Sequence, residues 1–151
     1  MSRIPQDVVD ELLVVLSKLY TSDHQTQLSI IQKHISPNIH FTDNIVSING
    51  IQNYTAQMKS LPLLFSKVEH VLIGECIVEN DEILIKNKQV YTIGGREIGL
   101  EVKTSLKMQK ENHGWVVVRH LDEWKGKIAL FQVAKVAFGS ASSFMIKLFL
   151  K

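Results

Sequence analysis

The stretch Ile98-Gly-Leu-Glu-Val-Lys-Thr-Ser-Leu-Lys-Met-Gln109 alternates, residue by residue, between mostly apolar and mostly polar side chains. Successive side chains of a β-strand point to opposite faces of the sheet, so this pattern predicts a strand with one buried face and one wet face. We expect the buried face to carry Leu100, Val102, Leu106 and Met108, and the wet face to carry Lys103 and Lys107.

Turn residues on both sides of this stretch predict that it belongs to an antiparallel meander of four long strands. Gly94-Gly95 is a strong hairpin signal, and Ile83–Ile93 before it reads as the partner strand. Asn80-Asp81 turns the chain back to an apolar strand over Val68–Val78. After the Glu111–Gly114 turn, Trp115–Trp124 reads as the last strand.

The first half of the chain has the period of helices instead. Apolar residues recur at helical spacing over Gln6–Tyr20, Thr26–Ile35 and Ile51–Phe65. Ser36-Pro37-Asn38 should end the second helix, Ile39–Ser47 should be extended, and Pro62 should kink or end the third helix. The order of elements predicts an α+β fold, with N-terminal helices packed on one face of a curved antiparallel sheet.

Composition bounds the class of protein. The chain has 151 residues, of which 45% are hydrophobic and 21% charged, as expected for one globular domain. A net charge of +2 without a basic cluster argues against a nucleic-acid partner. Cys76 is alone, and the N-terminus carries no secretory pattern, so we expect a cytoplasmic or nuclear protein without a disulfide.

Two local segments resemble the nuclear-transport-factor-2-like (NTF2-like) superfamily, in particular its SnoaL-like branch. One is Ile39-His-Phe-Thr-Asp-Asn44, followed by Gly50 and a helix that carries Tyr54; the other is the closing strand Gly114–Trp124. The resemblance covers about residues 6 to 124 and implies a cone-shaped pocket. It implies no single activity, since this fold hosts isomerases, dehydratases, cyclases, transport adaptors and pocket proteins.

The closing strand has the densest group of polar residues. Its alternation places His120 and Asp122 on one side, together with Val116, Val118 and Trp124. A histidine with a pKa near ~6.5 can act as a general acid or base, and a nearby aspartate can orient it. The structural interpretation, which the pattern favours, is that His120 and Asp122 pair with neighbouring strands instead.

Asp43 is the second catalytic candidate, because isomerases and dehydratases of the resembled family use a pocket aspartate to move a proton beside a carbonyl. Its position next to Asn44, at a strand-to-helix corner, favours a turn-forming role over catalysis. The aromatic residues that we expect in a ligand-binding pocket are Phe41, Tyr54, Tyr91 and Trp124.

No metal or cofactor site is predicted. The histidines are scattered and have no ligand spacing, and Gly94-Gly95 lies in a hairpin, not between a strand and a helix, so it makes no phosphate loop.

Residues 125–151 extend past the expected end of the domain, 1–124. They contain five lysines and no acidic residue, and their apolar residues fall on one helical stripe. We expect an amphipathic C-terminal helix with three alternative roles. It docks on its own domain, forms a dimer contact, or lies on a membrane surface through Lys127–Lys151.

Three functions therefore compete at this level. The first is a non-enzymatic pocket that binds a small apolar or amphipathic molecule, in a protein that can form a homodimer through its sheet. The second is a SnoaL-like proton-transfer enzyme of isomerase, dehydratase or cyclase type that uses His120 and Asp122, or Asp43. The third is an adaptor or peripheral membrane protein that works through the C-terminal helix.

Overall fold

The computed structural model describes residues 4–44 and 46–125. The helices are α1 (Gln6–Thr21), α2 (His24–His34) and α3 (Ile51–Leu64), and the strands are β1 (Ile35–Thr42), β2 (Ser47–Asn49), β3 (Lys67–Leu72), β4 (Ile77–Glu79), β5 (Glu82–Ile93), β6 (Arg96–Glu111) and β7 (Gly114–Trp124).

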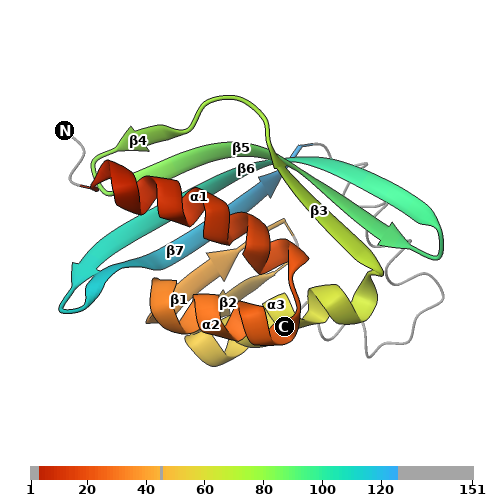
Figure 1. The fold of residues 1–151 in the computed structure, drawn as a ribbon, viewed down its shortest axis with the longest axis horizontal. Coiled ribbons are helices and arrows are strands. Elements are labelled where there is room, and N and C mark those ends of the chain that lie inside the picture. The colour runs from red at the N-terminus through yellow and green to blue at the C-terminus, as the bar shows by residue number, and fades with distance from the viewer. Residues whose placement is uncertain (1–3, 45, 126–151) are drawn as a thin grey trace.

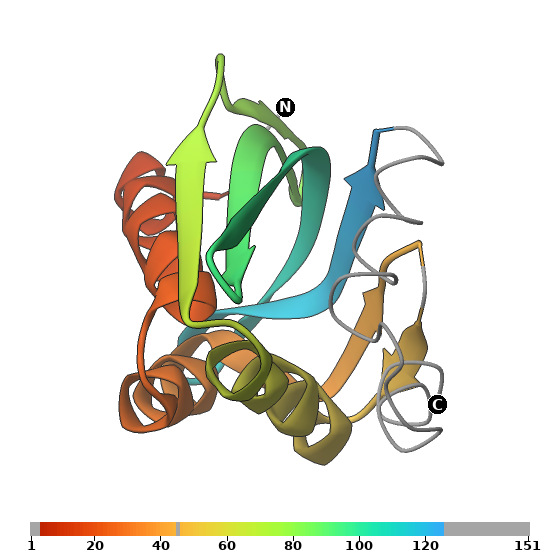
Figure 2. The same ribbon diagram turned by 90° about the vertical axis from the view of Figure 1, so that its right-hand side faces the viewer.

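The strands form one curved sheet in the order β2-β1-β7-β6-β5-β3, with β4 also paired to β5. All three helices lie on the same side of this sheet, and α1 runs across it (Figures 1 and 2). β1 runs parallel to β7, and the other pairs are antiparallel, so the sheet is mixed. The predicted α+β fold of helices on a curved sheet is confirmed.

The helices form where the sequence supplies an apolar face and a start signal. Helix α1 buries Val9, Leu12, Leu16 and Leu19, which recur at the spacing of one helix face. The Asp23 side chain caps α2 by accepting a hydrogen bond from the Thr26 amide at 2.9 Å. Helix α3 starts after Gly50, whose φ of +89° is one that glycine adopts easily, and it ends at Leu64, shortly after Pro62.

Strand β6 has the burial that its alternation predicts. Leu100, Val102, Leu106 and Met108 are buried, whereas Lys103 and Lys107 are exposed. The apolar face of β6 packs into the core that α1, α2 and α3 close from the other side.

The predicted end of the second helix and the predicted start of the extended segment after it are both wrong. The second helix ends at His34, and Ile35 and Ser36-Pro37-Asn38 belong to β1. The pairing of β1 with β7 shifts register between Ile35 and His40, and this irregularity accommodates Pro37, which has no N–H for a regular ladder.

The single strand predicted over Val68–Val78 is two strands, because the chain bends between β3 and β4 at Gly74, where φ is +95°. Both strands pair with β5, at different places along its length.

Strand β7 contains a bulge that changes which residues share a face. Lys107 pairs with Arg119 and Met108 with Val117, so Val118 is the extra residue on β7. Val117 therefore packs in the core, and the expectation that Val118 shares a face with His120 is wrong.

None of the helices in the described part of the chain is long and apolar enough to cross a bilayer. The C-terminal helix predicted over 125–151 lies outside the described residues, apart from Lys125.

Candidate functional site

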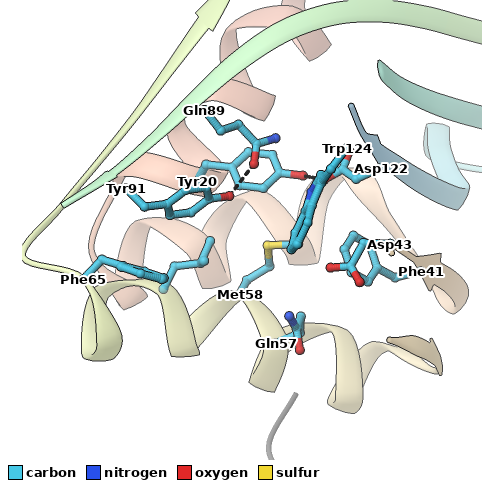
Figure 3. Close-up of a pocket in the computed structure, with 11 residues that line it drawn as sticks. Tyr20, Phe41, Asp43, Gln57, Met58, Phe65, Gln89, Tyr91, Asp122 and Trp124 are labelled. Atoms are coloured by element: carbon cyan, nitrogen blue, oxygen red, sulfur yellow. Dashed lines mark hydrogen bonds between the residues drawn. The ribbon is translucent and has the colours of Figure 1, made fainter. Parts of the chain in front are cut away.

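A cavity of about 30 Å³ lies between the helices and the inner face of the sheet (Figure 3). A water molecule needs roughly 10–15 Å³ measured in this way, so the cavity holds about two water-sized groups. It is lined by Tyr20, Phe41, Asp43, Gln57, Met58, Leu61, Phe65, Gln89, Tyr91, Asp122 and Trp124.

Several elements bring these side chains together. The alternation of β7 aims Asp122 and Trp124 inward, and that of β5 does the same for Gln89 and Tyr91. Tyr20 comes from the last turn of α1. In Figure 3, Trp124 stands between the two tyrosines on one side and Asp43 and Phe41 on the other, and Met58 and Gln57 lie on α3 below them.

Asp122 is the centre of a buried hydrogen-bond network. It is only 2% exposed, and its carboxylate accepts three contacts. Thr104 Oγ1 donates to Oδ1 at 2.7 Å, Tyr20 donates its hydroxyl proton to Oδ2, and His120 Nε2 lies 3.2 Å from Oδ1. A carboxylate buried in this way needs such donors, because burial without them is costly.

The network continues from Thr104 along β5, and the carboxylate fixes the direction of every bond. Because Thr104 donates to Asp122, its oxygen accepts from Asn87 Nδ2 at 2.8 Å. The amide oxygen of Asn87 then accepts from Gln89 Nε2 at 3.1 Å, and the Gln89 oxygen accepts the hydroxyl proton of Tyr91. All of these donors point toward Asp122, which makes the chain of bonds cooperative.

His120 lies behind this carboxylate and is fully buried, with 0% exposure. Its Nε2 is 3.0 Å from the Tyr20 hydroxyl oxygen, and its Nδ1 is 2.8 Å from the Tyr54 hydroxyl. Since Tyr20 gives its proton to Asp122, Nε2 must carry a proton to approach both groups. Nδ1 can then accept from Tyr54, so a neutral imidazole satisfies every bond.

The environment keeps Asp122 ionised and the tyrosines neutral. Burial alone raises the pKa of the Asp122 carboxyl, but the hydrogen bonds from His120, Tyr20 and Thr104 outweigh it, and the pKa lies below its ordinary value. Burial, with the charge of Asp122, raises the pKa of Tyr20, Tyr54 and Tyr91 well above the usual range.

The predicted site residues fall into two groups. Asp43, Asp122, Phe41, Tyr91 and Trp124 line the cavity. His120 and Tyr54 bond to each other behind it in the core; they are not among its lining residues and line a separate, smaller space instead.

Asp43 also has the turn-forming role expected from its place beside Asn44. Its Oδ1 accepts from the Val46 amide at 2.8 Å, and its own amide donates to the Val46 carbonyl at 3.0 Å. The turn fixes the carboxylate at the edge of the cavity.

Tyr20, Thr104, Asn87 and Gln89 are members of the site that sequence reasoning missed. Three of them had a readable signal. Thr104 occupies an inward position of β6, and Asn87 and Gln89 occupy inward positions of β5 between Ile85 and Tyr91. Polar side chains at core positions are hydrogen-bonded to one another in most proteins, so they mark a buried network.

His70 on β3 is a further buried histidine near the site. Its ring stacks on Tyr20 with centroids 5.3 Å apart and planes 4° apart. Neither ring nitrogen has a hydrogen-bond partner among the described residues. Burial, opposed by the charge of Asp122, lowers the pKa of His70.

Within residues 4–44 and 46–125, no group of three or more His, Cys, Asp or Glu side chains is placed to hold a metal ion.

Known structures share this architecture, although no protein-family model matches the sequence and no curated protein is significantly similar to it. A protein assigned as a SnoaL-like polyketide cyclase from Jannaschia sp. CCS1 superposes with a TM-score of 0.67 at 15% identity, over 91% of this chain and 95% of that one.

Two other structures extend the comparison. A protein with a ketosteroid isomerase-like fold from Catenulispora acidiphila, solved in complex with trimethylamine, gives a TM-score of 0.61 at 11% identity, over 74% of this chain and 83% of that one. A de novo designed protein with a curved β-sheet gives 0.57 at 16% identity, over 91% and 94%. The chain therefore has the NTF2-like fold of the SnoaL-like and ketosteroid isomerase-like proteins.

Proposed function

We propose that the protein is a binding module that holds a small molecule, or the end of a larger one, in the cavity beside Asp122. The observation that carries this proposal is the lining itself. Apolar and aromatic walls enclose a few convergent polar groups, which is the usual composition of a small-molecule site.

The size of the cavity sets what it can take. At about 30 Å³ it accommodates a head group of a few heavy atoms, and a polycyclic molecule does not fit without rearrangement. A protein of the same fold holds a molecule of this size, trimethylamine. The likeness to this structure supports the scale of the ligand, whereas the lining of this chain determines its chemistry.

The test is a fragment screen read by the fluorescence of Trp124 in a Trp115→Phe background. Trp124 lines the cavity, so we expect blue-shifted emission and poor quenching by iodide in the free protein. Alcohols, ketones, amines and carboxylates of up to about five heavy atoms are the probes, a range that suits a site of two water-sized groups and its mouth. At least one class should change the emission saturably.

A cavity-filling variant supplies the control. Leu61→Phe adds volume at the lining, whereas Leu64→Phe adds the same ring on α3 at a half-buried residue outside the lining. We expect Leu61→Phe to abolish fragment binding while the protein remains folded, and Leu64→Phe to leave binding intact. Equal binding by both variants would place the ligand elsewhere.

Proton transfer is the second candidate function, and Asp43 is the observation that favours it. Asp122 already accepts three hydrogen bonds, which makes it a weak base. Asp43 is half-buried at the cavity edge, where the Val46 amide holds its carboxylate, and is the proposed base for a proton beside a carbonyl. Hydrogen–deuterium exchange at the α-carbons of butanone, followed by NMR, should then be accelerated by the protein and not by Asp43→Asn.

A further inference from the structure

We infer that His70 makes one edge of the sheet sensitive to acid, so that protonation of its ring releases β3 from β5 and α1. The inference concerns the fold itself and does not depend on the proposed binding function. Three observations support it: the ring is buried without hydrogen-bond partners, its surroundings do not compensate a positive charge, and β3 lies at the edge of the sheet.

The His70 ring tolerates only its neutral form in the closed structure. The residue is 9% exposed, and neither Nδ1 nor Nε2 forms a hydrogen bond to a described residue. The Tyr20 ring covers one face of it, with centroids 5.3 Å apart and planes 4° apart. A protonated imidazole has two N–H donors and a charge, and burial of an unpaired charge costs far more than burial of an unpaired polar group.

The titratable groups of β7 near this ring do not offset that cost. They are Asp122 and His120, and burial outweighs the attraction of the Asp122 charge, so the pKa of His70 lies below its ordinary value. Donors of the buried network already occupy the Asp122 carboxylate. It therefore has no hydrogen bond left to give a charged His70.

The other elements in contact with β3 are β5, α1 and α3, and they bring neutral groups to the ring. Gln89 lies opposite His70 on β5, and Tyr91 lies one pair further along the same face. On α1, Tyr20 stacks against the ring. Burial raises the pKa of both tyrosines well above the usual range, so neither is charged in mild acid.

The remaining titratable groups of α3 and β3 are engaged or exposed. On α3, the Tyr54 hydroxyl bonds to His120, and Lys59 is exposed. On β3 itself, Lys67 and Glu69 pair with each other at 2.8 Å. Both belong to the face of the strand opposite to His70, because side chains alternate along it.

Strand β3 can leave the sheet while the centre of the sheet stays intact. Among the described strands it pairs with β5 alone and ends the sheet beside α1 (Figure 2). Ser17 of α1 donates to the His70 carbonyl at 3.3 Å, and Val71 and Leu72 are 53% and 42% exposed. A strand with one neighbour and few buried apolar residues opens at a lower free energy than the whole fold.

Acid acts by stabilising the open state. Once β3 is released, the ring reaches water and binds a proton with the ordinary histidine pKa of ~6.5, whereas the closed state binds one only at lower pH. A fall in pH through this interval therefore shifts the population toward the open state. The release also uncovers the Tyr20 ring, so one wall of the cavity loses its support.

The experiment is amide hydrogen exchange of the full chain at about pH 7.5 and about pH 5.5, on either side of the open-state pKa. Protection factors are compared, because they correct for the effect of pH on the intrinsic exchange rate. The reporters are the amides of β3 and of Ile73, which donates to the Lys86 carbonyl at 2.9 Å. The amides of β6, which is paired on both sides, report unfolding of the whole fold. We expect the β3 protection to fall by about tenfold more than that of β6.

Two substitutions assign the effect to the imidazole. His70→Phe keeps a ring against Tyr20 and cannot bind a proton, and His70→Gln keeps a polar side chain that does not titrate. In both variants, the ratio of β3 to β6 protection should be the same at the two pH values. His34→Gln is the matched control, because it removes another buried histidine, one on α2 that lies 3.7 Å from Glu11. It should retain the tenfold fall in β3.

Two outcomes would overturn the inference. If β3 and β6 lose protection equally in acid, the whole fold unfolds and β3 has no opening of its own. If His70→Phe and His70→Gln retain the fall in β3 protection, another group causes it. Neither outcome bears on the binding proposal, which the fragment screen tests at neutral pH.

Discussion

At the scale of single residues, the energetics of the site depend on one buried charge. Asp122 collects bonds from Thr104, Tyr20 and His120, and through Thr104 it orients Asn87, Gln89 and Tyr91. A buried charge without partners destabilises the folded state. Removing one partner from such a network therefore costs more stability than replacing the whole network by apolar residues. Removing any single partner from this network should therefore destabilise the fold.

Thr104→Val tests this dependence. Valine has nearly the shape of threonine, so packing is conserved, but both the Asn87 amide and the Asp122 carboxylate lose a partner. We expect the free energy of unfolding in urea to fall by about 2–4 kcal/mol, since each buried group without a partner costs about 1–3 kcal/mol. Thr92→Val, at a half-buried position of β5, should cost far less. Equal losses for the two variants would contradict the role given to the network.

The residues of the site were partly predictable. His120, Asp122 and Asp43 stand out because an alternating strand or a corner displays them. The roles of these residues could not be predicted from the sequence, because the roles depend on contacts with α1 and α3, which are distant in sequence. Tyr20 reaches Asp122 and Tyr54 reaches His120 across the core, and no local pattern encodes such contacts.

At the scale of elements, β6 is the strand that organises the core, since it pairs with both β5 and β7 over most of its length. Leu106→Ala should therefore destabilise the protein by about 2–5 kcal/mol, as large-to-small changes in a well-packed core do. Lys107→Ala, at the next position but on the wet face, should be nearly neutral. A thermal melt of Leu106→Ala that coincides with the unsubstituted protein would remove Leu106 from the core.

Gly50 sets the start of α3, the helix that carries Tyr54, Met58 and Leu61. Its φ of +89° and ψ of 150° are strained for any residue with a Cβ, even though a Cβ there would meet nothing within 4 Å. We expect Gly50→Ala to lower the free energy of unfolding by about 1–3 kcal/mol through backbone strain. Gly99→Ala is the comparison, because its Cβ would meet only the flexible stem of Lys88, at 3.1 Å. It should cost less than Gly50→Ala.

The helices and strands were predicted better than their boundaries and irregularities. Helix α1 and strand β6 have strong periodicities, and both came out within a few residues of the expected bounds. The errors lie where tertiary pairing overrides local signals. Ser36-Pro37-Asn38 resembles a helix stop but lies within β1, between the residues of that strand that pair with β7, and the bulge at Val118 reverses the facing of the residues that precede it. In both places, pairing with a neighbouring strand decides the backbone structure, and the local sequence does not.

At the scale of the whole molecule, the fold does not determine the function. A designed protein and a protein assigned as a polyketide cyclase both superpose over 91% of this chain, so the scaffold alone specifies no activity. The roles predicted for Lys127–Lys151, which are docking, dimerisation or membrane contact, stay predictions of the sequence.

The response of the whole fold to acid combines the buried histidines with Asp122. Burial lowers the pKa of His70 and, with opposition from Glu11, that of His34, so both are harder to protonate in the folded protein than in the unfolded chain. Asp122 has a lowered pKa as well. In each case the unfolded state binds protons first as the pH falls, and the free energy of unfolding decreases with it.

The loss of stability should therefore come in two windows. The first begins as the pH falls through the unfolded histidine pKa of ~6.5 and continues to the lower folded values; the second begins below the unfolded aspartate pKa of ~3.9. His70→Phe retains a ring against Tyr20 and removes the titrating nitrogens, so it should flatten the first window and leave the second. Urea unfolding at a series of pH values measures both windows, and a first window as steep in His70→Phe as in the unsubstituted protein would assign it to His34 or to another group.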